Sequence, residues 1–274
     1  MKRYIALLVS IVLTALTASA QTDETTQLEQ TAPAETAEQV VATDHNTLWD
    51  SANVAYNEGD YAKATELYES ILADNLHSAK LYFNLGNAYY KQDKLGKAIL
   101  NYNRALRLAP ADEDIRHNLE YATEATKDNI EEIPEFFLTT WVKKVRNLMG
   151  CDGWTIFSYA MLIVALIGAL AYLLAEVLNY RKAGFYTLCI AALLFIVSTI
   201  FAYNEREALV NSSEAIIMSS AAPIKSSPDR AATDLFVLHE GTKLTTGESI
   251  DGWVEIRIAD GRKGWIESSR IEQI

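Results

Sequence analysis

The 274-residue chain has too little cysteine and too little positive charge for several classes of protein. Its 2 cysteines exclude a disulfide-stabilised scaffold and a four-cysteine zinc site. The 24 Lys and Arg residues stand against 36 Asp and Glu, which gives a net charge of −12, and no basic block occurs. Because nucleic-acid binding depends on neutralising phosphates with Lys and Arg, the composition argues against a nucleic-acid partner.

The common catalytic and cofactor-binding motifs are also missing. The sequence has no Gly-x-Gly-x-x-Gly, P-loop, His-Glu-x-x-His, Gly-x-Ser-x-Gly or Cys-x-x-Cys. We expect the four scattered histidines at the surface: His45, His77, His117 and His239. The protein is therefore predicted not to be an enzyme and to need no cofactor or metal. The opposing hypothesis, a cryptic hydrolase, would need a reactive group that the sequence does not display.

Residues 1–20 have the pattern of a signal peptide. A basic start, Lys2-Arg3, precedes an uncharged apolar run, and Ala18-Ser19-Ala20 has the small-x-small form that signal peptidase cleaves. An uncleaved anchor is the alternative, and in both cases the following chain is exported. Residues 21–46 are rich in Thr, Glu, Gln and Ala and lack aromatic residues, so we predict a disordered acidic leader.

Two uncharged apolar runs, 153–175 and 183–204, are each long enough to cross a bilayer, which takes about 20 helical residues. We predict a transmembrane hairpin whose tight turn holds Arg181 and Lys182; a pair of buried core helices is the alternative. With an exported start, the turn is cytoplasmic, as basic residues prefer. Both soluble regions are then periplasmic, and the protein belongs to the bacterial inner membrane.

The segment 134–149, just before the first span, is amphipathic. Its apolar side chains recur at helical spacing: Phe137, Trp141, Val145 and Leu148. Three cations project elsewhere on the same helix: Lys143, Lys144 and Arg146. This pattern is typical of a helix that lies in the headgroup plane of a membrane. The alternative is a juxtamembrane linker without a special role.

The exported region 47–130 repeats itself with a period of 34. Four residues return one period later, since Tyr56, Ala64, Tyr68 and Leu72 are followed by Tyr90, Ala98, Tyr102 and Leu106. The second copy resembles the tetratricopeptide (TPR) pattern W-x2-L-G-x2-Y, A-x3-F, P. Its structural positions hold Tyr82, Leu85, Gly86, Tyr89, Ala98, Tyr102, Ala105 and Pro110. We predict two repeats followed by a capping helix that starts at Asp112 or Asp114.

The two copies differ in how closely they follow the pattern. Small residues at Gly86 and Ala98 allow two antiparallel helices to approach closely. The first copy keeps Ala64 and Tyr68, but has Leu48, Ser51 and Ala52 where Trp, Leu and Gly are usual. Because each repeat buries its apolar face on its neighbours, two repeats are few for an independent array. We expect support from a partner, a second copy or the membrane helix.

In TPR proteins the first helix of each repeat lines a concave face that binds peptides. The residues that face it in this register are Trp49, Asn53, Tyr56, Asn57, Lys80, Phe83, Asn87, Tyr90 and Lys91. Asn53 and Asn87 are predicted to hydrogen-bond a peptide backbone. The third helix offers Asp114 and Asn118 where a carboxylate clamp needs cations, so capture of an acidic C-terminus is not predicted. A merely solvated surface is the alternative.

The region 205–274 changes to short alternating strands. We expect strands near 215–218, 223–225, 236–238, 243–246, 253–258 and 263–266, with Asp260-Gly261 in a hairpin turn. The string from Leu238 to Ile266, with its Gly-Trp pairs, resembles the bacterial SH3-like domain and predicts a small barrel. Trp253 and Trp265 either form a ligand platform or, as we favour, pack partly within the barrel.

The predicted architecture is a multidomain membrane protein with all-α TPR repeats, a two-helix transmembrane hairpin and a small all-β SH3-like barrel. This order of parts resembles the BatE-type family of the bacterial aerotolerance (Bat) operon, found in Bacteroides and relatives. The resemblance is carried mainly by Leu81 to Tyr90, Ala98 to Pro110 with Asp114 to Leu119, and Phe236 to Gly241.

The resemblance implies protein partners in a cell-envelope complex linked to oxidative-stress tolerance. They are membrane-anchored von Willebrand factor A proteins, other TPR members of the operon and a MoxR-type ATPase. The predicted function is thus a non-enzymatic scaffold or adaptor. The alternative is an envelope sensor whose SH3-like domain binds peptidoglycan or a peptide, although the short cytoplasmic turn offers such a sensor no output domain.

Overall fold

The computed structural model describes residues 33–128, 130, 133–134 and 136–274, with side chains described from residue 45 onward. The expected signal peptide lies outside the described residues. The chain divides into two units after residue 50, and this boundary falls within helix α2 (Pro33–Asn57). This helix starts inside the segment 21–46 that was expected to be disordered. Its first residues, Pro-Ala-Glu-Thr-Ala-Glu-Gln, combine a proline at the first helical position with good helix formers, which explains the early start.

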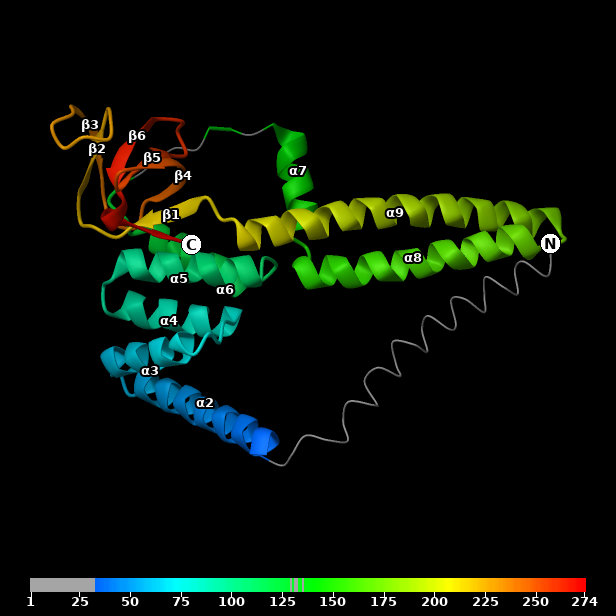
Figure 1. The fold of residues 1–274 in the computed structure, drawn as a ribbon, viewed down its shortest axis with the longest axis horizontal. Coiled ribbons are helices and arrows are strands. Elements are labelled where there is room, and N and C mark those ends of the chain that lie inside the picture. The colour runs from blue at the N-terminus through cyan, green and yellow to red at the C-terminus, as the bar shows by residue number, and fades with distance from the viewer. Residues whose placement is uncertain (1–32, 129, 131–132, 135) are drawn as a thin grey trace. The chain divides into compact units, whose positions relative to one another are not determined.

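The helical repeat region continues with α3 (Tyr61–Ala73), α4 (Ala79–Lys91), α5 (Leu95–Leu108) and α6 (Glu113–Glu124), which pack on one another in sequence order (Figure 1). Asp60 caps α3 through the Lys63 amide, and Ser78 caps α4 through the Leu81 amide. Of the two candidate caps for the last helix, the structure selects Asp112, which accepts from the amides of Asp114 and Ile115.

Gly86 sets the closest approach between α4 and α5. A Cβ at this position would lie 2.7 Å from both Cδ1 and Cε1 of Tyr102 and 3.3 Å from the Ala98 oxygen. The ring of Tyr102 therefore occupies the space that a larger residue would need. Ala98 itself is fully buried, as is Ala52 at the Gly86-equivalent position of the first repeat. The predicted packing of small residues between the paired helices is confirmed.

The C-terminal sheet supports α5 from the side that α4 leaves uncovered. Contacts join α5 to strand β1 (Glu214–Ile217), and nearly every side of the helix is buried. Gly96 donates its amide to Glu240 Oε1 at 2.9 Å, and Arg104 Nη2 donates to the Gln273 oxygen at 2.7 Å. The support that a two-repeat array requires thus comes from the chain's own sheet, which the sequence did not indicate.

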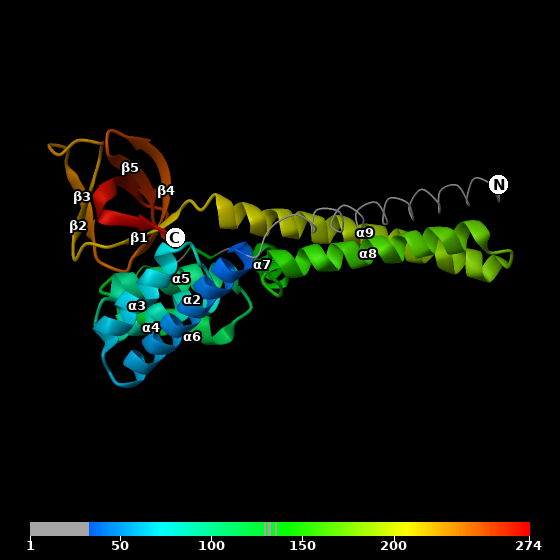
Figure 2. The same cartoon turned by 60° about the horizontal axis from the view of Figure 1, so that its bottom comes forward.

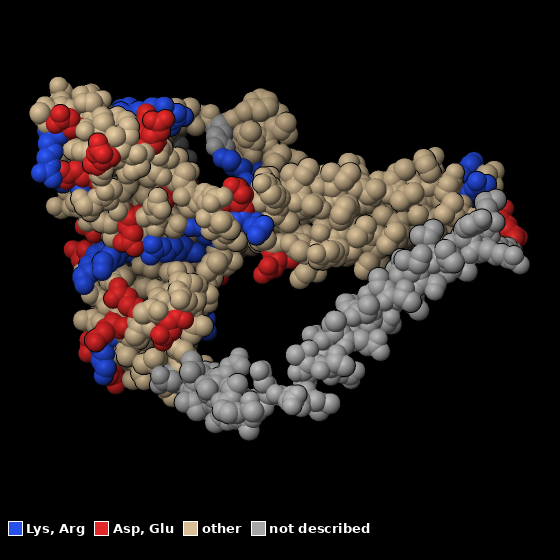
Figure 3. Space-filling view, viewed as in Figure 1, with Lys and Arg blue, Asp and Glu red and all other residues tan. Residues whose placement is uncertain are grey.

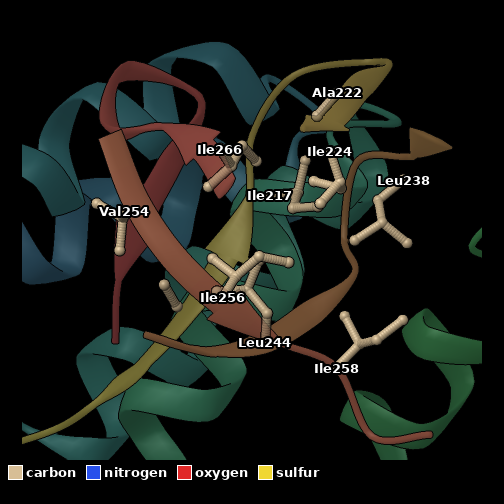
Figure 4. Packing of buried hydrophobic residues seen from close by; sticks show 10 residues of the cluster. Ile217, Ala222, Ile224, Leu238, Leu244, Val254, Ile256, Ile258 and Ile266 are labelled. Carbon is tan, nitrogen blue, oxygen red and sulfur yellow. The ribbon is translucent and has the colours of Figure 1, made fainter. Parts of the chain in front are cut away.

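The seven-stranded antiparallel sheet has the strand order β3-β2-β6-β5-β4-β1-β7. Its strands after β1 are β2 (Ala222–Lys225), β3 (Asp234–Leu238), β4 (Lys243–Ile250), β5 (Trp253–Arg257), β6 (Lys263–Glu267) and β7 (Ile271–Gln273). Gly261, at φ +86°, closes the β5–β6 hairpin in the predicted place. Ile224, Ile256 and Ile266 lie in the sheet's apolar core (Figure 4).

The sheet is not a closed barrel, which corrects the prediction. Strands β3 and β7 end the strand order and do not pair with each other. The edge strand β7, a three-residue segment after the short 3-10 turn Ser268–Arg270, was not expected from the sequence. It pairs with β1 through Ile217 opposite Ile271, so the chain end joins the strand that contacts α5. The unpredicted strand therefore widens the sheet without closing it.

Helices α8 (Cys151–Leu174) and α9 (Leu178–Val210) form an antiparallel hairpin and lie side by side in both views (Figures 1 and 2). Both are long and apolar enough to cross a membrane. Cβ atoms added at Gly168 or Gly184 would lie 2.8 Å and 2.6 Å from backbone nitrogens of the opposite helix. The glycines therefore permit backbone-to-backbone packing, as in membrane helix pairs.

The outer face of the hairpin is apolar, and its charges gather at the ends (Figure 3). The connection between the helices is shorter than predicted, so Arg181 and Lys182 lie within the first two turns of α9. Their backbone continues the helix because no proline or glycine interrupts Leu178 to Ala183. Both cysteines, Cys151 and Cys189, are free.

Candidate peptide-binding groove

The candidate groove is built on the end of α2 and on α4, the first helices of the two repeats. Tyr68 Oη donates to Asn53 Oδ1 at 2.7 Å, and Asn84 Nδ2 donates to the same oxygen at 3.1 Å. One repeat later, Tyr102 Oη donates to Asn87 Oδ1 at 2.7 Å, and Asn118 Nδ2 donates to it at 2.9 Å. We call these two sets the Asn–Tyr–Asn networks. Each residue of the second follows its counterpart by one 34-residue period.

The networks fix the orientation of both predicted asparagines. Each Oδ1 accepts two hydrogen bonds, which uses both lone pairs of an amide oxygen. Within the described part of the chain, the Nδ2 groups of Asn53 and Asn87 have no hydrogen-bond partner, and both residues border a cavity. Each asparagine therefore presents an amide donor in a set direction, as recognition of a backbone carbonyl requires.

A cavity of about 270 Å³ lies at the first network. Its lining is neutral and polar, and consists of Asn53, Tyr56, Asn57, Tyr68, Asn84 and Asn87. Burial raises the pKa of the Tyr68 hydroxyl, and also that of Tyr56 together with the neighbouring Tyr61. Both hydroxyls therefore stay protonated at neutral pH and remain donors. The cavity suits a segment that is itself uncharged and extended.

The structure brings together most of the predicted groove residues and adds others. Asn53, Tyr56, Asn57 and Asn87 share the cavity, as expected from the repeat register. Asn84 was not predicted to belong to the site, although its position one period before Asn118 is a signal that could have identified it. Tyr68 was assigned a structural role alone, whereas its hydroxyl also orients Asn53.

The aromatic residues of the predicted groove are partly used in packing. The Phe83 ring lies 6.0 Å from the Tyr102 ring, and its side chain is half-buried. The Tyr90 ring lies 5.7 Å from that of Tyr121, an exposed residue of α6 that the sequence did not single out. Tyr121 stands one period after Asn87, so the third helix replaces the asparagine donor with an aromatic ring.

The remaining predicted residues are not among those that line the cavity. Lys80 and Lys91 are exposed at the two ends of α4, where they place positive charge beside the neutral cavity. Trp49 belongs to the unit that ends at residue 50, where it lies on α2 with a half-buried side chain. Asp114, the acidic residue expected on the third helix, is exposed on the first turn of α6.

The tryptophans of the sheet form a poorer candidate site. Trp253 and Trp265 lie on the same face of the β5–β6 pair, because Trp253 is opposite Glu267 and Glu255 is opposite Trp265. Trp253 is only 9% exposed and Trp265 is half-buried. The exposed area of the pair is therefore small, in agreement with the favoured packing role.

His239 is partly buried, in contrast to the expected surface position. Asp128, just after α6, accepts from the His239 amide at 2.6 Å and from Thr242 Oγ1 at 2.7 Å, and its Oδ1 lies 2.6 Å from His239 Nδ1. Burial alone would raise the pKa of the Asp128 carboxyl, but these hydrogen bonds outweigh burial and hold it below its ordinary value of 3.8. The ionised carboxylate therefore joins the repeat region to the sheet.

Comparison with known families agrees with the helical repeat. Residues 50–113 match the family model for the tetratricopeptide repeat, which covers α3, α4, α5 and the end of α2. No match was found among curated proteins. The family match supports a role in protein–protein interaction for the region that contains both asparagine donors.

Proposed function

We propose that the protein is a membrane-anchored adaptor whose helical repeats bind an extended segment of a partner protein. The observation that carries this proposal is the pair of Asn–Tyr–Asn networks, which leave two amide donors, one repeat apart, at the border of one cavity. An extended peptide presents backbone carbonyls along its length, so repeated donors suit it better than a small ligand. The tetratricopeptide match supports the same conclusion.

The chemistry of the groove favours a neutral or weakly acidic segment. The cavity lining is asparagine and tyrosine, and Lys80 and Lys91 stand at either end of α4. Asp114 on the third helix disfavours a terminal carboxylate at that position, since like charges repel. The partner's segment is therefore expected to be internal, and not a free acidic C-terminus.

The hairpin supplies the anchor in this proposal. Two antiparallel spans return the chain to the side from which it entered, so the helical repeats and the sheet share one side of the membrane. Arg181 and Lys182 at the opposite end favour a cytoplasmic connection. The expected signal peptide favours a periplasmic location for both soluble regions at the inner membrane, although Lys143, Lys144 and Arg146 then lie on the outer side.

The resemblance to the BatE-type family suggests which partners to seek. They are membrane-anchored von Willebrand factor A proteins and other Bat operon products, in an envelope complex connected with oxidative-stress tolerance. Anchoring both proteins in one membrane raises their effective concentration, so a groove of modest affinity is sufficient. No catalytic role is included, because the sequence offers no recognised catalytic motif.

The alternative of a peptidoglycan- or peptide-binding sensor depends on the SH3-like identity proposed for the sheet and on its tryptophans. The small exposed area of Trp253 disfavours a stacking platform there. Binding of the full-length protein to isolated cell wall, abolished by Trp265→Ala, would nevertheless support that alternative.

The adaptor function is tested with asparagine-to-aspartate variants. Asn53→Asp and Asn87→Asp keep the oxygen that accepts from Tyr68 or Tyr102 and replace only the exposed amide donor. We expect the double variant to lose at least tenfold of partner recovery when the tagged protein is purified from its native membranes. Lys63→Glu, at an exposed position of α3, changes the net charge by the same two units as the double variant and is expected to retain recovery. Equal partner recovery with the double asparagine variant and the Lys63 variant would refute the assignment of the groove as the binding site.

A further inference from the structure

We propose that α7 (Phe137–Arg146) and its flanking residues lie in the membrane interface, with the apolar side among lipid chains and the lysines against anionic phospholipid headgroups. We call residues 136–149 the interface segment. The proposal rests on the membrane placement of the α8–α9 hairpin described above. It adds a second, lateral contact with the bilayer to that anchor.

The interface segment exposes large apolar side chains that the rest of the described chain does not cover. Phe136, Phe137, Trp141 and Leu148 are 64%, 73%, 61% and 65% exposed. None of the residues of α7 is buried. Several large apolar side chains exposed within one short segment mark a site of interaction.

The residues of α7 are segregated around the helix. At 100° per residue, one arc holds the apolar set Phe137, Leu138, Trp141, Val142 and Val145. The other arc holds the polar and charged set Thr139, Thr140, Lys143, Lys144 and Arg146. A helix with one apolar and one cationic face is suited to lie along a membrane surface, with aromatic residues at headgroup level.

The end of α7 is attached to the open end of the hairpin, where α8 begins and α9 ends. Trp154 Nε1 donates to the Arg146 oxygen at 2.7 Å, and Arg146 Nε lies 2.7 Å from Glu205 Oε1. Cys151 Sγ contacts the Ala202 oxygen at 3.6 Å, which joins the same ends of the two helices. Glu205 directly follows the uncharged run 183–204, so this attachment lies at the boundary of the hydrocarbon layer.

This location selects lipid over a protein as the occupant of the apolar face. A bilayer that surrounds the hairpin necessarily reaches the residues attached to its open end. The charge also agrees, because the chain from 136 to 151 contains three cations and no acidic residue. The side chains of Lys143 and Lys144 are exposed on the polar arc, and their positive charge complements anionic headgroups.

The proposal is tested with spin labels on the full-length protein in nanodiscs of phosphatidylcholine with phosphatidylglycerol. Single cysteines replace Phe137, Trp141 or Thr140 in a Cys151→Ser, Cys189→Ser background. Accessibility is measured to oxygen, which concentrates in lipid, and to a water-soluble nickel chelate. We expect the oxygen-to-nickel ratio at 137 and 141 to exceed that at Thr140, on the polar arc, by at least threefold.

Two results at these positions would overturn the proposal. Equal, nickel-dominated accessibility at all three would mean a solvated linker, and low accessibility to both reagents at 137 and 141 would mean a protein partner or a second copy. A label at Leu193, exposed midway along α9, separates this failure from failure of the membrane placement itself. Leu193 must show an oxygen excess if the hairpin spans the bilayer.

The headgroup contact is tested by the lipid charge. Removing phosphatidylglycerol is expected to reduce the oxygen excess at position 141, and Lys143→Gln with Lys144→Gln is expected to remove that dependence. Each lysine near an anionic surface contributes about 1 kcal/mol, which corresponds to about fivefold in occupancy of the interface. An equal response to phosphatidylglycerol in the double variant would contradict the assignment of the lysines.

Discussion

At the scale of single residues, the helical repeats use tyrosine side chains both to fill the space between helices and to orient asparagine side chains. Asn53 and Asn87 are held by tyrosines whose rings fill the repeat interior, so one residue type provides both core volume and a hydrogen bond. Tyr102 is also the ring that fills the space beside Gly86. A change at Gly86 is therefore expected to affect both the packing and the second asparagine.

We predict that Gly86→Ala lowers the free energy of unfolding by about 1 to 3 kcal/mol. The added Cβ must displace the Tyr102 ring, and the cost of overpacking exceeds the gain of up to about 1 kcal/mol in helix propensity. Chemical denaturation of the purified protein in detergent measures the change. Gly96→Ala is not a suitable control, because Glu240 lies equally close to it, whereas Ala62→Gly at an exposed position of α3 loses propensity alone.

At the scale of elements, the packing of the α8–α9 hairpin depends on two glycines that let the helix backbones approach closely. Gly168 and Gly184 occupy the crossing of α8 and α9, where each faces backbone atoms of the other helix. Backbone cannot move aside as a flexible side chain does. The helix pair is thus expected to be more sensitive to side-chain volume at these two sites than on its exposed surface.

We predict that Gly184→Leu separates the two helices, while Ala183→Leu, one residue earlier and exposed, is tolerated. The expected loss is about 1 to 3 kcal/mol or more, because a Cβ at Gly184 already lies 2.6 Å from the Tyr172 nitrogen. Unfolding in detergent mixtures with increasing dodecyl sulfate, followed by circular dichroism, compares the two variants. Equal stability of the variants would contradict the packing described here.

The elements were largely predictable where the sequence has a strong period. The 34-residue repeat predicted α3 to α5, and the uncharged runs predicted α8 and α9. The early start of α2 at Pro33 was missed because composition alone suggested disorder. The hydrogen bonds that Asn53 and Asn87 accept from the asparagine of the neighbouring helix were not predicted. They join side chains of different helices, and no local sequence pattern determines such contacts.

At the scale of the whole unit 51–274, the sheet and the helical repeats act as one body. Gly96 with Glu240, Arg104 with the last strand, and Asp128 with His239 and Thr242 connect segments far apart in sequence. Such contacts leave no periodic signal, so the sequence predicted separate domains without a junction between them. A partner bound at α4 is therefore held at a fixed position relative to the sheet.

We predict that the Asp128 junction loses its contribution at acidic pH. The lowered pKa of Asp128 in the folded protein means that its stabilisation is complete above the ordinary value of 3.8 and is lost as the pH falls through the lower folded value. Asp128→Asn is expected to cost about 1.5 to 3 kcal/mol at pH 7 and progressively less below about pH 4. Denaturation curves from pH 7 to pH 3 test this, with exposed Glu248→Gln as the control.

The central claim, that the helical repeats bind a partner while the hairpin anchors the protein, is tested most directly by photo-crosslinking in the native membrane. A photoreactive phenylalanine analogue replaces Tyr56 or Tyr90 in the groove, or Leu76 in the exposed α3–α4 loop as a control. The account predicts a discrete crosslinked partner from both groove positions, absent from Leu76 and reduced by Asn87→Asp. Crosslinks that are equally strong from Leu76, or unaffected by Asn87→Asp, would contradict it.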